Sequence, residues 1–86
     1  MKLINILTLS SALLLSSLII HAEPVNINTA DVSTISNKLI GIGLIKAQAI
    51  VDYRKLHGKF SSAEQIIMVK GIGEKTFKKN LEDILL

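Results

Sequence analysis

The apolar residues of this chain form one long run and then several segments with helical spacing. The run covers residues 3–20, and beyond it apolar positions recur three or four residues apart, which is the period of one face of an α-helix. The spacing predicts helices over residues 29–38 and 44–57, a third helix that opens at residues 61–64, and a fourth over residues 74–85. No strand pattern of useful length appears, so the part of the chain after the apolar run is predicted to be a small all-α domain.

Local signals mark where these helices begin and end. Asn28 is predicted to be the N-cap of the first helix, with Asp31 in its first turn, where a negative charge is favourable. Gly58 follows the second helix as a natural stop. Ser61 and Glu64 have the spacing of a capping box at the start of the third.

The inward faces of these elements supply the expected core. A short extended segment, residues 24–27, precedes the first helix with alternating apolar residues. The expected buried residues are Ala30, Ile35, Leu39, Ala47, Ile50, Val51, Phe60, Ile66, Ile67, Val69, Phe77, Leu81, Ile84 and Leu85.

A short motif occurs twice, between the first two helices and between the last two. Residues 39–43 read Leu-Ile-Gly-Ile-Gly and residues 69–73 read Val-Lys-Gly-Ile-Gly, 30 residues later. Two glycines around one apolar residue suit a sharp turn whose central side chain, Ile42 or Ile72, points inward. The outward N–H groups, with the free donors of the following helix, make a concavity that suits a phosphate. One Gly-Ile-Gly could be a tight turn and nothing more; two at matched positions favour an anion site.

The two copies differ in detail. The preceding apolar residue lies four positions back in the first copy, at Ile35, and three back in the second, at Ile66. Ala47 in the first copy matches Phe77 in the second, so the helices of the two hairpins are expected to pack differently.

Lysines gather near the second copy. Lys46 and Lys75 follow the two turns closely, and Thr76 is a candidate first-turn donor, although exposed lysines often only solvate a helix face. A cluster of Lys70, Lys75, Lys78 and Lys79 is partly offset by Glu74, Glu82 and Asp83. The predicted phosphate-contacting residues are Gly41, Ile42, Gly43, Lys46, Lys70, Gly71, Ile72, Gly73, Lys75, Thr76 and Lys79.

The N-terminal run is predicted to be a secretory signal peptide over residues 1–22. Lys2 supplies a positive start, and Ala22 is a small residue at the expected cleavage site. The alternative is an uncleaved membrane anchor, because the run approaches the length of a bilayer span. No cysteine is present, which excludes disulfides and a lipid-modified cysteine.

Removal of 22 residues from 86 would leave a domain of 64 residues, residues 23–86, and would lower the formal net charge from +3 to +2. So mild a charge makes the placement of the lysines decisive. The chain shows no nucleophile and base set and no paired carboxylates, so no enzyme, cofactor or metal is expected. His57 has no second histidine or cysteine beyond the leader with which to hold zinc.

The glycine turns resemble the helix-hairpin-helix DNA-binding motif, and the whole predicted domain resembles the ComEA competence-protein family. The resemblance rests on residues 25–30, 41–43, 46–50, 53–54, 58, 60 and 69–73. It implies a periplasmic, non-catalytic domain that binds double-stranded DNA during uptake in natural transformation, in contact with the uptake machinery at the inner membrane. It also implies that the two hairpins hold phosphates of both strands across a minor groove.

Phosphate contacts carry no sequence information, and no helix rich in Arg, Asn or Gln is available for a major groove. The sequence therefore predicts binding that depends on salt but not on base sequence. The competing hypothesis is a small exported helical domain that binds other proteins and has no role with DNA.

Overall fold

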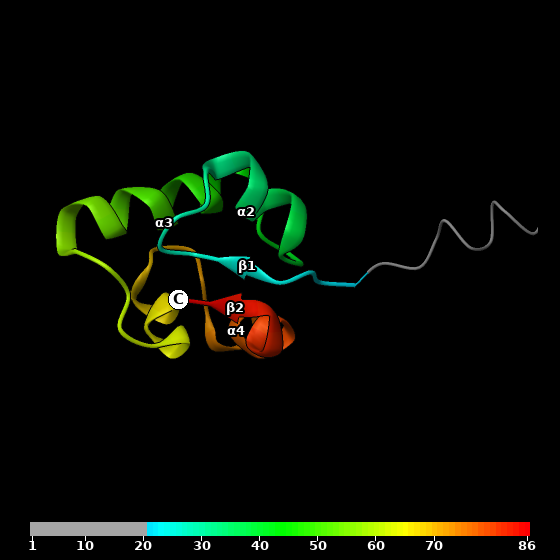
Figure 1. Ribbon diagram of the computed structural model, residues 1–86. Coiled ribbons are helices and arrows are strands. Elements are labelled where there is room, and N and C mark those ends of the chain that lie inside the picture. The colour runs from blue at the N-terminus through cyan, green and yellow to red at the C-terminus, as the bar shows by residue number, and fades with distance from the viewer. Residues whose placement is uncertain (1–20) are drawn as a thin grey trace, which may run out of the picture.

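The computed structural model describes residues 21–86, which form two helical hairpins joined by a short strand pair (Figure 1). The elements in chain order are β1 (Val25–Asn26), α2 (Val32–Lys38), α3 (Leu44–His57), the 3₁₀ helix η1 (Ala63–Met68), α4 (Glu74–Asn80), the 3₁₀ helix η2 (Leu81–Asp83) and β2 (Ile84–Leu85). The mainly helical domain with four principal helices is confirmed, and α3 has the predicted bounds. The predicted signal peptide, apart from residues 21 and 22, lies outside the described residues.

The strand pair joins the two ends of the domain. β1 and β2 run parallel with Val25 opposite Ile84, and the Ile27 N–H donates to the Leu85 carbonyl at 3.0 Å. Figure 1 shows α2 and α3 on one side of this pair and α4 on the other. The prediction of one helix through residue 85 is wrong, because the chain leaves α4 at Asn80 and pairs with β1. The pairing buries Ile84 and leaves Leu81 and Leu85 exposed.

The first helix begins later than predicted, because Asp31 is its N-cap. The Asp31 carboxylate accepts a hydrogen bond from the Thr34 N–H at 2.9 Å, and the hydrogen bonds from Thr34 hold the pKa of this carboxyl below its ordinary value. Asn28, the predicted cap, instead pairs with the backbone of Phe60. It accepts from the Phe60 N–H at 2.7 Å and donates to the Phe60 carbonyl at 3.0 Å.

The third helix is a 3₁₀ helix, and the predicted capping box does not form. Ser62 is the N-cap and its side chain makes no capping bond. Gln65, rather than Glu64, reaches back and accepts from the Ser61 N–H at 2.8 Å and from the Ser61 hydroxyl at 3.0 Å.

One hydrophobic core connects both hairpins and the strand pair. Its buried apolar residues are Val25, Ile27, Ile35, Leu39, Ile42, Ala47, Ile50, Val51, Phe60, Ile66, Val69, Ile72, Phe77 and Ile84. Ala30 and Ile67, also expected inside, are only partly buried at its edge. Arg54 contributes as a structural residue, because its guanidinium donates to the Ile27 carbonyl at 2.8 Å.

A buried asparagine joins the second hairpin to the first. Asn80, at the end of α4, is 0% exposed. Its amide accepts from the Ile40 N–H at 2.7 Å and donates to the carbonyls of Ile40 at 2.8 Å and Thr76 at 2.9 Å. The residue before Gly41 is thereby fixed to α4, 40 positions away in the chain.

No helix within residues 21–86 has the length and apolar character needed to cross a bilayer.

Replacing Asn80 with alanine should lower the free energy of unfolding by about 1–3 kcal/mol, because it leaves the N–H and carbonyl of Ile40 without partners in a partly buried position. Asn37→Ala is the matched control: Asn37 is exposed on α2, and a surface change of this kind should stay within about 0.5 kcal/mol. Urea unfolding followed by circular dichroism measures both. Equal effects would show that the Asn80 amide does not hold the hairpins together.

Candidate functional site

The two Gly-Ile-Gly turns have the same backbone design. The first glycine of each turn has a positive φ, 74° at Gly41 and 91° at Gly71. Residues with a Cβ atom rarely adopt such a φ. The central residues, Ile42 and Ile72, are buried as predicted. Each turn is therefore anchored by an isoleucine and exposes its backbone.

The second glycine of each turn is the N-cap of the following helix. Gly43 and Gly73 are extended, and their carbonyls accept the first helical hydrogen bonds, from Ala47 at 2.9 Å and Phe77 at 3.1 Å. A glycine has no side chain to bond the first-turn N–H groups, and neither helix has a side-chain cap. These donors of α3 and α4 remain available to an anion.

The turns differ in how they close. Leu39 donates to Ile35, four residues back, at 3.0 Å, whereas Val69 donates to Ile66, three residues back, also at 3.0 Å. The spacing difference seen in the sequence thus appears as an α-helical end in one hairpin and a 3₁₀ end in the other. The Ile72 N–H donates to the Val69 carbonyl at 3.1 Å, so it closes the second turn and is not free for a ligand.

Lys46 links the two turns in space. A Cβ added to Gly71 would lie 3.7 Å from Cγ and 3.8 Å from Cε of Lys46. The aliphatic stem of this α3 lysine therefore lies over the turn of the other hairpin. A Cβ added to Gly41, Gly43 or Gly73 would have no atom within 4 Å, so the space in front of these three glycines is open.

Of the other predicted lysines, Lys70 and Lys75 flank the second turn, whereas Lys79 lies in the last turn of α4, at the far end of that helix. Lys70, Lys75 and Lys79 are exposed. The ion pair found within residues 21–86 joins Lys78 to Glu74 at 3.5 Å, between exposed side chains. Thr76, the predicted hydroxyl donor, is half-buried at the start of α4.

Sequence reasoning missed Asn80, which positions the first turn. The 30-residue repeat places Asn80 opposite Ile50, a position predicted to be buried. A polar residue at a buried position of a repeat must find hydrogen-bonding partners, and that signal could have identified it.

In the described part of the chain, no three His, Cys, Asp or Glu side chains gather closely enough to hold a metal ion.

Known proteins are similar in sequence to this chain over nearly all of its described residues. Residues 21–84 match the family model of the helix-hairpin-helix motif. An uncharacterized protein of Haemophilus influenzae is 50% identical over 64 residues, which cover 74% of this chain and 57% of that protein. ComE operon protein 1 of Bacillus subtilis is 47% identical over 55 residues, which cover 64% of this chain and 26% of that protein. The chain thus matches only part of the length of these relatives.

The two glycines of the first turn should tolerate substitution differently. Gly41→Ala should lower the free energy of unfolding by about 1–2 kcal/mol, because alanine resists a positive φ although space for its methyl group exists. Gly43→Ser should leave stability unchanged or raise it slightly, because serine is a favourable N-cap at an extended position. Thermal unfolding of the two variants beside the wild type tests the assignment, and equal losses would contradict it.

Proposed function

Because the chain belongs to the helix-hairpin-helix family, we propose that it binds double-stranded DNA through the phosphates at its two glycine turns. The observation that carries the proposal is the pair of uncapped helix starts behind Gly43 and Gly73. Both present free N–H donors on an exposed turn, and lysines lie beside them. Backbone donors and lysines are the groups that contact DNA phosphates.

Lys46 supports the binding of one duplex by both turns. Its stem belongs to α3, which starts at the first turn, and it lies over Gly71 of the second turn. A charge carried by one hairpin is thus brought to the other. Each hairpin then holds one strand, and the phosphates face each other across a minor groove.

The binding is independent of base sequence and belongs to a binding module rather than an enzyme. Phosphates are identical along the duplex, and the proposed contacts do not reach base edges. The resemblance to the ComEA competence family and the similarity to ComE operon protein 1 support a role in DNA uptake during natural transformation. In that role the protein retains incoming DNA in the periplasm and passes it to the uptake machinery at the inner membrane.

A salt titration separates this function from that of a domain that binds only proteins. If about four phosphates are contacted, log K should fall against log salt with a slope of about −3.6. Lys75→Ala combined with Lys79→Ala should make the slope shallower by up to about 2. The loss should be equal for two unrelated duplexes, measured by fluorescence anisotropy.

The matched control removes two exposed lysines at the opposite end of α3, Lys55 and Lys59. This double alanine variant carries the same net charge as the first but should keep the wild-type slope. If the wild-type protein does not bind a duplex at low salt, the proposed function is wrong and the protein-interaction alternative is favoured. Equal slopes for the two double variants would show that bulk charge, not the second turn, binds DNA.

Export is tested by the mass of the protein recovered from cells. Cleavage after Ala22 should give a mature chain that begins at Glu23 and is released with the periplasmic fraction. Intact-mass spectrometry of the fractions checks this. A membrane-bound form that retains Met1 would instead support the anchor.

A further inference from the structure

The two turns are followed by residues of opposite character. Leu44 and Ile45 directly follow the first Gly-Ile-Gly, whereas Glu74 and Lys75 occupy the same positions of the second copy. Leu44 is 62% exposed and Ile45 is 88% exposed, so neither serves the core. An exposed apolar pair at the opening of a candidate binding turn is a candidate contact surface.

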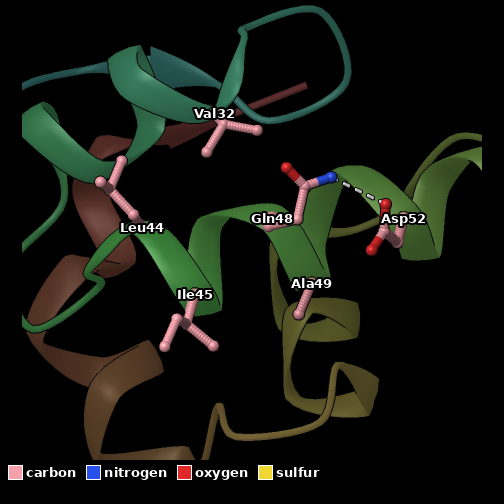
Figure 2. A pocket seen from close by; sticks show the side chains of 6 residues that line it. All are labelled: Val32, Leu44, Ile45, Gln48, Ala49 and Asp52. Carbon is pink, nitrogen blue, oxygen red and sulfur yellow. Dashed lines mark hydrogen bonds between the residues drawn. The ribbon is translucent and has the colours of Figure 1, made fainter.

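Ile45 lies on the surface beside the first turn. With Leu44 it lines a shallow hollow that also includes Gly41, Gly43 and Lys46. Figure 2 shows a second hollow, which Ile45 lines together with Leu44, Gln48, Ala49 and Asp52 of α3 and Val32 of α2. The isoleucine thus stands beside the first turn and next to Lys46, whose stem lies over Gly71 of the second turn.

We propose that Ile45, supported by Leu44, makes an apolar contact with the deoxyribose edges of the minor groove between the bound phosphates. The inference rests on the proposed function, because a duplex held at both turns passes its groove over the surface between them. The sugar edges that line a minor groove present C–H groups, and apolar side chains are recurrent minor-groove contacts. The contact adds affinity that does not depend on counterion release.

The two turns then contribute in different ways. The second turn carries Lys70 and Lys75 and receives the stem of Lys46, so it supplies charge. The first turn supplies backbone donors and an apolar surface. Its contribution to affinity persists at salt concentrations that weaken the lysine contacts.

The test compares Ile45→Ser with Leu56→Ser in duplex titrations at several salt concentrations. Leu56 lies on the same helix, is 79% exposed and belongs to the opposite end of α3. Both substitutions remove an exposed apolar side chain and neither changes charge, and circular dichroism confirms that both variants fold. Ile45→Ser should weaken binding about tenfold at every salt concentration with an unchanged slope, since burying such a side chain is worth about that much. Leu56→Ser should bind like the wild type.

Three results would overturn the inference. If both variants bind like the wild type, Ile45 does not touch DNA, although the proposed function stands. If Ile45→Ser makes the slope shallower, its effect is on the lysines and not an apolar contact. If Ile45→Ser changes sedimentation of the free protein and not DNA affinity, the surface binds protein. A wild type that binds no duplex at all would instead remove the proposed function itself.

Discussion

The amide of Asn80 is the interaction on which the arrangement of the two turns depends. It is fully buried, and its donors and acceptor are all directed at backbone groups of Ile40 and Thr76. A buried amide is costly unless every polar atom finds a partner, so the geometry at Ile40 is strongly constrained. Asn28 makes the same reciprocal pair with Phe60. These two asparagines and the β1–β2 pair connect distant segments in a chain without cysteine.

The parts of the fold that could be predicted are those set by neighbouring residues. α3 has the expected bounds because Gly43 and Gly58 mark its two ends, the second with a φ of 88°. The buried isoleucines of the turns followed from the repeat alone. The end of α4 could not be predicted, because it depends on pairing with β1 at the other end of the domain. The prediction of Asn28 as the first helix cap was wrong for the same reason, because Asn28 forms hydrogen bonds with a residue 32 positions away.

The features of the site also separate into those set by neighbouring residues, which could be predicted, and those set by distant contacts, which could not. The different spacing before the two turns appears in the structure as a change from an i−4 to an i−3 hydrogen bond, which is a local feature. The position of the Lys46 stem over Gly71 could not be predicted from the sequence, because it depends on how one hairpin packs against the other. The engaged N–H of Ile72 was also missed, because the N–H groups of the turns were treated as outward-facing donors.

The asymmetry of the two turns has a physical consequence for a chain of such low net charge. A protein that relies on phosphate contacts alone loses affinity steeply as salt rises, and the loss grows with the number of contacts. Adding lysines strengthens binding at low salt but makes that dependence steeper. An exposed apolar side chain such as Ile45 would add affinity without making binding more dependent on salt. In the proposed complex, the repeat therefore gains from diverging after its glycines, where the core imposes no requirement. The backbone of both turns is kept, and the two helix starts would supply different kinds of contact.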